Sequence, residues 1–104
     1  MSAPKQGPFI LVATAVAKGP SEADILQDML LAVTKKANTA EEGTKTYRLS
    51  RDANDTLKFI VFEEYTDEAA FEAHKSSAEF QALAQKVDEL TSVFEFQFLH
   101  ELHP

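Results

Sequence analysis

The sequence predicts an α+β domain with the ferredoxin-like order βαββαβ, in which a four-stranded antiparallel sheet carries its helices on one face. Two observations support this prediction. Segments with strand-like and helix-like patterns follow one another as strand, helix, strand, strand, helix and strand. The chain of 104 residues also has the size of one domain, so a single core has to serve all of these segments.

The first strand and helix are predicted from an apolar run and a periodic pattern. Residues 9–17 are apolar except for Thr14, which favours a central strand covered on both faces. After a break at residues 18–20, Ser21 resembles a helix N-cap, with the acidic Asp24 three residues further on. Apolar residues then recur at the spacing of an amphipathic helix of about four turns. They are Ile25, Leu26, Met29, Leu30, Val33 and Ala37.

A hairpin is predicted in the middle of the chain. A second strand through Tyr47 and Leu49 follows Gly43 and a short polar link. Residues 52–55 read Asp-Ala-Asn-Asp, and such side chains bond their own backbone in turns. Residues 57–65 form the third strand, which is antiparallel to the second because the connection is short.

The last third of the chain predicts a helix in two pieces and a final strand. Asp67 is placed to cap the first piece, and Ser76 or Ser77 to restart the second. Residues 93–102 alternate between aromatic and polar side chains, which predicts a strand with Phe94, Phe96 and Phe98 on one face. A sheet with helices on one face leaves the other open, and the apolar run at residues 9–17 indicates that a second copy of the chain covers it.

Composition excludes several classes of function. The formal net charge of −7 argues against nucleic-acid binding, which needs clustered Lys and Arg. With no cysteine, the chain cannot form disulfides, thiolate nucleophiles or iron–sulfur clusters. It carries no G-x-G-x-x-G or P-loop fingerprint and no histidine spacing typical of a metal site, so we expect neither cofactor nor metal.

The ends of the chain and its hydropathy indicate where the protein resides. Residues 1–8 contain Lys5, Gly7 and two prolines, and we expect them to form a short flexible arm before a single domain at residues 9–104. No signal-type cleavage site follows this arm, and no apolar run approaches the ~20 residues that span a bilayer. We therefore expect a soluble, cytoplasmic protein that does not bind membranes.

His74 is the strongest candidate for chemistry. Its ordinary pKa near 6.5 lets it exchange protons at neutral pH. On its predicted helix it shares a face with Ala70 and Phe71, which turns it inward or toward a pocket rim. The alternative is a structural histidine that bonds a carbonyl or carboxylate and fixes the helix on the sheet.

Glu63 is the second candidate. The strand period places this acid on one face with Phe59 and Tyr65, among large apolar groups. Either that face borders a polar cavity or Glu63 pairs with a cation from the neighbouring strand, Arg48 or Arg51. Of these two, an ion pair is favoured.

The remaining candidates are expected to bind a substrate. Tyr47 and Tyr65 each offer an apolar ring with a hydroxyl tip, which suits the orientation of a planar ligand, although most such tyrosines only pack in cores. Four apolar residues complete the predicted pocket: Met29, Phe62, Phe71 and Leu83. His100 and His103 lie too close to the chain end to rank as catalytic.

The spacing of these residues resembles the antibiotic biosynthesis monooxygenase family. The family pattern runs E-[PEx]-G-x-x-x-Y, then R-D, then F-x-x-x-E-x-[YW]-x-[DS]-x-x-A-x-x-x-H-x-x-[ST]-x-x-F. The matching residues here are Glu41 or Glu42, Gly43, Tyr47, Arg51, Asp52, Phe59, Glu63, Tyr65, Asp67, Ala70, His74, Ser77 and Phe80.

This resemblance implies a dimeric α/β-barrel, formed by two chains through their sheets, with one pocket per subunit between sheet and helices. It also implies a cofactor-independent monooxygenase that oxidises a small hydrophobic metabolite with O₂, such as an aromatic polyketide, a quinol or an oxylipin-like compound. His74 would then transfer the proton, Tyr47 or Tyr65 would orient the substrate, and Glu63 or an arginine would tune the site. A haem-degrading branch of the superfamily uses an asparagine and a histidine where this chain has Val12 and Ala84, which argues against haem.

Two other functions fit the same pattern. Relatives of similar sequence isomerise a small signalling molecule or act on quinones, because such a pocket can move protons without O₂. A dimeric module that binds a hydrophobic metabolite without catalysis is the third possibility, since fold alone does not fix function.

Overall fold

The computed structural model describes residues 2–104 and shows the predicted order of elements. The elements are β1 (Phe9–Ala17), α1 (Pro20–Ala40), β2 (Thr44–Arg51), β3 (Lys58–Tyr65), α2 (Glu68–Lys75), α3 (Ala78–Leu90) and β4 (Thr91–Leu99). The last strand thus begins and ends earlier than the predicted 93–102, and the third begins one residue later than predicted. The α+β fold class is confirmed.

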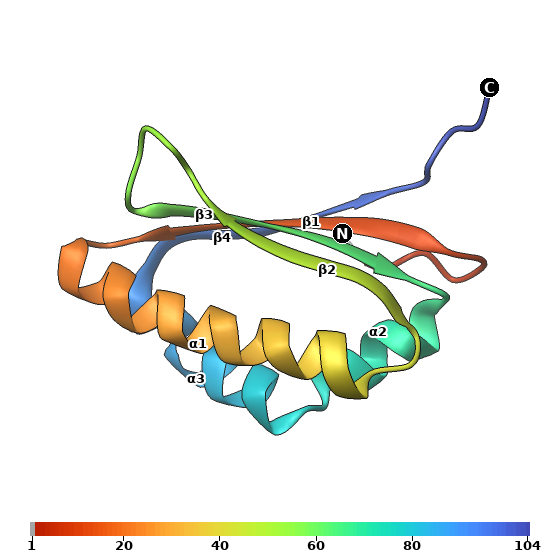
Figure 1. The fold of residues 1–104 in the computed structure, drawn as a ribbon, viewed down its shortest axis with the longest axis horizontal. Coiled ribbons are helices and arrows are strands. Elements are labelled where there is room, and N and C mark those ends of the chain that lie inside the picture. Colours follow the sequence, from red (N-terminus) through yellow and green to blue (C-terminus); the bar gives the residue numbers. More distant parts are fainter. Residues whose placement is uncertain (1) are drawn as a thin grey trace.

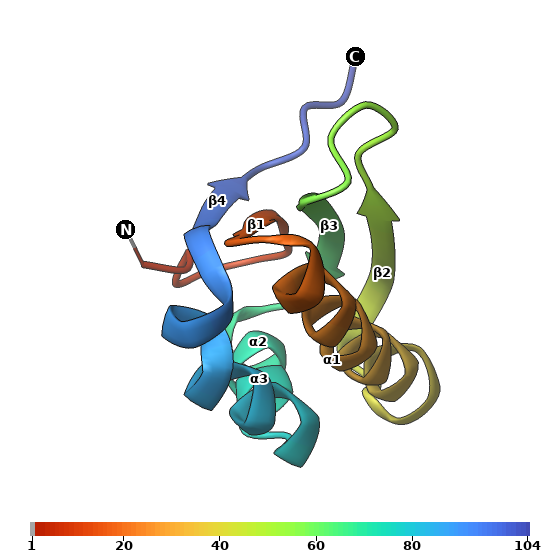
Figure 2. The same ribbon diagram turned by 90° about the vertical axis from the view of Figure 1, so that its left-hand side faces the viewer.

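The sheet has the ferredoxin-like strand order. Its strands pair antiparallel in the order β2-β3-β1-β4, so β3 and β1, the two strands that lead into the helices, lie at its centre. The helices cover one face of this sheet (Figure 1). Viewed from the end, α1 and α3 lie next to each other beneath the strands (Figure 2). The core therefore lies between one sheet face and the helical layer.

The first helix differs from the prediction at its start and in its length. Gly19 is the N-cap residue of α1, and Ser21 lies inside the first turn, where its hydroxyl bonds the neighbouring glutamate. Pro20 explains the shift, because its fixed φ suits the first helical position. The helix continues for 21 residues, well beyond four turns. The Asn38 side-chain amide donates to the backbone oxygen of Tyr47 and ties the last turn to β2.

The other predicted caps and turns are confirmed. The Asp67 carboxylate accepts a backbone N–H in the first turn of α2, and the Ser77 hydroxyl does the same in α3, so Ser77 rather than Ser76 restarts the helix. In the hairpin, the Asp52 carboxylate accepts the backbone N–H groups of Asn54 and Asp55 at 2.8 and 2.9 Å. Each cap satisfies donors that would otherwise lack a partner.

The sequence predicted that β1 is covered on both faces. Within a single chain, only one face of β1 is covered. Its side chains alternate between buried and half-buried positions along the strand. The half-buried side chains share the open face with Phe62 of β3 and Leu99 of β4, which are 39% and 37% exposed. The open face thus presents apolar side chains from both central strands, among them Val12, Ile60 and Phe62.

The segment before β1 carries no helix or strand at residues 2–8. Lys5 in this segment pairs with Glu68 of α2 at 3.1 Å, and Ala3 packs against the core. Met1, the first residue of the predicted arm, lies outside the described residues. Along residues 2–104, no helix combines the length and the apolar character needed to cross a membrane.

Gly43 is required by a close approach between β2 and α2. A Cβ atom at this position would overlap the Cβ of Ala70 and also crowd the α2 backbone. We expect Gly43→Ala to lower the free energy of unfolding by about 1–3 kcal/mol, as overpacking does in cores. Urea denaturation would measure the change. Gly19→Ser is the control, since its Cβ meets only the end of the Glu22 side chain, and equal losses in both variants would contradict the prediction.

Candidate functional site

His74 lies in the last turn of α2 and is buried against the sheet, with 1% of its surface exposed. The Asp67 cap fixes the start of this short helix, and the helical period then turns His74 toward β2 and β3. Its Nδ1 atom lies 2.8 Å from Oε1 of Glu41. Its Nε2 atom has no hydrogen-bond partner among residues 2–104. The imidazole is therefore held at one nitrogen and free at the other.

Glu41 also belongs to this cluster, although it was not among the candidate site residues predicted from the sequence. It is the C-cap residue of α1, and its Oε1 atom lies next to Nδ1 of His74 and accepts a hydrogen bond from the Thr44 hydroxyl at 2.9 Å. Its other carboxylate oxygen, Oε2, is buried and lacks a partner within the described part of the chain. The family pattern has an acidic residue shortly before Gly43, and this feature could have identified Glu41 as a candidate.

Glu63 faces the same interior from β3 and is 3% exposed. Its register partner on β2 is Tyr47, and the Tyr65 hydroxyl donates a hydrogen bond of 2.5 Å to its Oε1. That same oxygen lies 4.0 Å from Nε2 of His74. Two acid side chains, Glu41 and Glu63, thus flank the imidazole on opposite nitrogens.

The expected ion pair between Glu63 and an arginine is wrong. Arg48 lies opposite Phe62, one position from Tyr47, so the strand alternation directs it to the open face. Arg51 lies opposite Phe59, four residues and roughly 13 Å along β3 from Glu63. Its guanidinium stacks over the Phe59 ring at 4.9 Å. Glu63 instead faces the interior cluster, where it contacts Tyr65 and lies near His74.

Burial controls the protonation of these groups. Burial raises the pKa of Glu63 to about 8, against the opposing hydrogen bond from Tyr65 and with help from the charge of Glu41. Burial lowers the pKa of His74, although the Glu41 hydrogen bond and charge oppose this shift. Burial also raises the pKa of both Tyr47 and Tyr65. At neutral pH the site thus combines a neutral imidazole with a largely protonated Glu63.

Aromatic rings enclose His74 on several sides. The ring centroids of Tyr47, Phe80 and Tyr65 lie 5.2, 5.3 and 5.6 Å from that of the imidazole. A small internal cavity lies beside these rings and is lined by Tyr47, Glu63, Phe80 and Leu83. The volume that the centre of a water molecule can occupy in it is about 10 Å³. That is the room of about one water. A larger ligand reaches this site only after side chains such as Phe80 or Leu83 move.

The structure brings together only part of the predicted pocket. Tyr47, Tyr65 and Leu83 surround or line the cluster, and Phe71 packs on Tyr65 with ring centroids 5.3 Å apart. Two predicted residues lie elsewhere. Met29 lines a groove between α1 and α3 on the outer side of the helical layer. Phe62 lies on the open face of the sheet, because adjacent residues of a strand point to opposite faces.

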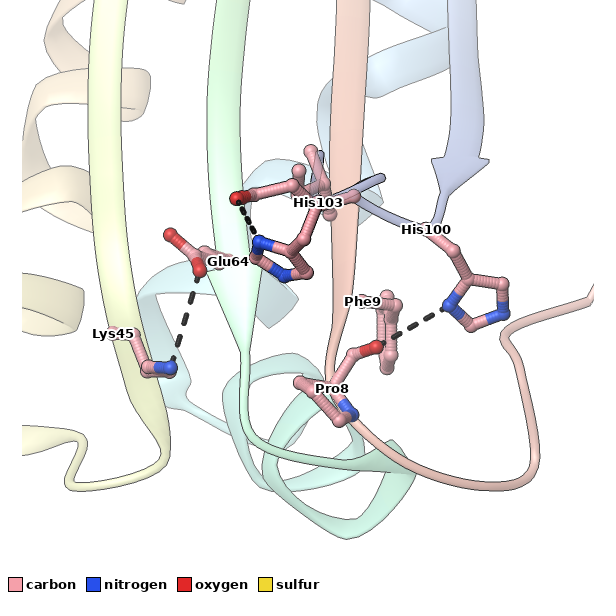
Figure 3. A pocket seen from close by; sticks show the side chains of 8 residues that line it. Pro8, Phe9, Lys45, Glu64, His100 and His103 are labelled. Carbon is pink, nitrogen blue, oxygen red and sulfur yellow. Dashed lines mark hydrogen bonds and ion pairs between the residues drawn. The ribbon is translucent and has the colours of Figure 1, made fainter.

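A second hollow of about 340 Å³ lies at the end of the sheet, where residues 100–103 meet the start of β1. Figure 3 shows Lys45 paired with Glu64 and the His100 ring next to the backbone of Pro8. His103 pairs with the exposed Glu101 at 3.5 Å. The ion pairs are solvent-exposed and weak, and this hollow contains none of the groups around His74.

No group of three His, Asp or Glu side chains able to hold a metal ion occurs in the part of the chain that the structure describes. The cluster around His74 offers proton donors and acceptors in an apolar enclosure. An arrangement of this kind can move a proton at neutral pH and shelter the resulting anion from water.

The fold and this enclosed His–Glu cluster define a small α+β domain with ionisable side chains buried between sheet and helices. The model of the antibiotic biosynthesis monooxygenase family matches residues 8–86. The chain belongs to that family. A curated relative, the Bacillus subtilis protein named putative monooxygenase YcnE, is 38% identical over 53 residues, which cover 51% of this chain and 56% of YcnE. The match thus spans little more than half of that relative.

Solved structures show the same fold over nearly the whole chain. Protein PA3566 from Pseudomonas aeruginosa superposes with a TM-score of 0.85 and 28% identity, covering 96% of this chain and 99% of PA3566. A putative antibiotic biosynthesis monooxygenase from Caulobacter crescentus gives a TM-score of 0.81 at 22% identity, with 94% and 92% covered. The second likeness supports the fold alone.

Proposed function

We propose that this protein is a cofactor-independent monooxygenase that oxidises a small hydrophobic metabolite with O₂. The observation that carries the proposal is the buried imidazole of His74, whose Nε2 has no partner in residues 2–104 and lies among aromatic and apolar side chains. The names of related proteins as monooxygenases support the same reaction class.

The substrate supplies the electrons in this reaction. A CH₂ group made acidic by a neighbouring phenol, enol or anthrone-like ring loses a proton, and the resulting anion reduces O₂. One oxygen atom becomes a carbonyl on that carbon, and the other leaves as water with the two hydrogens of the CH₂ group. Four electrons pass from the substrate to O₂, so the balance requires no external reductant.

Each residue of the cluster has a role in this scheme. His74 accepts the substrate proton at Nε2 and returns it to the reduced oxygen. Glu63, protonated near neutral pH, offers an O–H that stabilises the substrate anion, as a neutral carboxylic acid in an apolar site can. Tyr65 holds Glu63 in place through its hydroxyl, while Tyr47 and Leu83 form the wall of the cavity.

Oxygen consumption tests this function directly. The chelator-treated protein is offered phenolic, anthrone-like and fatty-acid-derived compounds, and uptake of O₂ is followed with an electrode. Uptake that survives chelation supports the proposal. Saturable binding of the same compounds without any O₂ uptake contradicts it and leaves the non-catalytic binding module.

A proton-transfer isomerase is the second candidate. The 4.0 Å separation of Glu63 and His74 favours it, because a base and a protonated acid on one ligand can move a proton between two carbons. Deuterium exchange into a substrate without O₂ uptake would distinguish this reaction from oxygenation.

We also propose that two chains pair through their open sheet faces. The apolar surface around Phe62 and Leu99 supports this, since an exposed apolar face is stabilised by a matching surface and a second copy offers one. We expect Phe62→Lys to shift the sedimentation mass from two chains to one. Ile25→Lys is the control, because this 51% exposed residue lies on the helical side. A dimer that persists in Phe62→Lys at micromolar concentration contradicts this interface.

A further inference from the structure

We propose that Glu41 is a positioning residue for His74. It holds the imidazole as the tautomer with hydrogen on Nδ1, which leaves the lone pair of Nε2 available as a base. It also balances the positive charge that forms when Nε2 takes a proton. This inference rests on the proposed function in assigning that proton to a substrate, while the tautomer itself is a property of the protein alone.

The chemistry of the two groups gives the direction of the hydrogen bond. A carboxylate accepts hydrogen bonds and cannot donate them, so the 2.8 Å contact requires hydrogen on Nδ1. A neutral imidazole carries only one N–H, and Nε2 is then an acceptor. The Thr44 hydroxyl donates a hydrogen bond to the same Glu41 oxygen at 2.9 Å and holds the carboxylate next to the ring.

Glu41 differs from Glu63 in its surroundings. Besides His74, Glu41 lines an outer groove of about 450 Å³ with Lys36 and Ser76, near the ends of α1 and α2. Its side chain is 9% exposed, whereas that of Glu63 is 4% exposed. Glu41 thus approaches the imidazole on the Nδ1 side and Glu63 on the Nε2 side.

The titratable groups that face the imidazole come from three elements. Glu41 approaches from the end of α1, Tyr47 from β2, and Glu63 and Tyr65 from β3. Only Glu41 lies within hydrogen-bond distance of a ring nitrogen in the described chain. The tautomer is therefore set by this one residue.

Nitrogen-15 NMR of the protein labelled at histidine tests the inference without a substrate. At pH 8 we expect wild-type His74 to show hydrogen on Nδ1, and Glu41→Ala to move the majority to the Nε2–H form that free histidine prefers. Glu41→Asp should return the signal toward wild type, and the exposed neighbour variant Glu42→Gln should leave it unchanged. Hydrogen on Nε2 in the wild type would overturn the proposal, whether or not any variant folds.

Persistence of the Nδ1–H form in folded Glu41→Ala would also overturn it, because Glu41 would then not set the tautomer. Once a substrate is found, we expect Glu41→Ala to lower kcat by about tenfold or more with KM unchanged. Failure of the oxygenase function would appear as absent O₂ uptake in the wild type, which the NMR result does not affect. The two proposals can therefore fail separately.

Discussion

Replacing Glu63 with Gln is expected to make the protein more stable in mildly alkaline solution. Glu63 is 3% exposed, and burial raises its pKa from 4.5 to about 8 in the folded state. Gln keeps the shape and can still accept the Tyr65 hydroxyl, but it carries no charge at any pH. The variant therefore avoids the cost of ionising a carboxyl group inside the core.

The sign of the pH dependence follows from this raised pKa. A folded-state pKa above the unfolded value means that the native state binds the proton more tightly, so Glu63 contributes its full stability below pH 4.5. That contribution is lost as the pH rises toward and through about 8. The upper limit is about 4–5 kcal/mol over this window.

Urea denaturation of wild type and Glu63→Gln from pH 4.5 to 9 measures the effect. Burial lowers the pKa of His74, which makes wild-type stability rise with pH up to about 6.5, but this trend is common to both proteins and cancels in their difference. Glu89→Gln, whose side chain is 66% exposed, is the control. If the difference in unfolding free energy between wild type and Glu63→Gln stayed constant across this pH range, Glu63 would be ionised without cost.

The fold could be predicted from the sequence because the caps and turns that mark its elements are formed by residues close together in the chain. Asp67 and Ser77 each accept a backbone N–H within their own helix, and the Asp52 turn is complete within four residues. The start of α1 was mispredicted for the same local reason, since Ser21 and Gly19 both suit an N-cap and Pro20 decided between them.

The contacts within the site were harder to predict from the sequence, because they join residues that are far apart along the chain. Glu41 and His74 are 33 positions apart, and their contact depends on how far α1 continues before the chain turns into β2. The partner of Glu63 depends on the register of β2 and β3, in which a slip of one residue would exchange Tyr47 for Arg48. Single-residue patterns identified His74 and Glu63 but could not give their neighbours.

The cluster contains groups that a core selected for stability alone would avoid. An imidazole nitrogen and a carboxylate oxygen are buried without partners in residues 2–104, and each such group costs about 1–3 kcal/mol. An apolar side chain of the same shape in place of His74 would remove that cost. The retention of polar groups here is explained when they act on a ligand, which supplies the missing partner.

The largest effect on activity is expected from His74→Gln. Gln can donate its amide to Glu41 and preserve the contact between α2 and the end of α1, but it cannot accept a proton at neutral pH. We expect kcat/KM for O₂ uptake to fall by about 10²–10⁴, the usual contribution of a positioned general base. Substrate affinity should change little, because the cavity walls formed by Tyr47, Phe80 and Leu83 remain.

His100→Gln is the matched control, since this exposed histidine lies beyond β4 and its Nδ1 atom bonds the backbone oxygen of Pro8. Its rate should equal that of the wild type. A wild-type rate in His74→Gln would mean that the cluster only fixes α2 on the sheet, which was the structural alternative for this histidine. Loss of the rate together with an unchanged unfolding free energy would separate chemistry from packing, because a merely structural histidine would lower both.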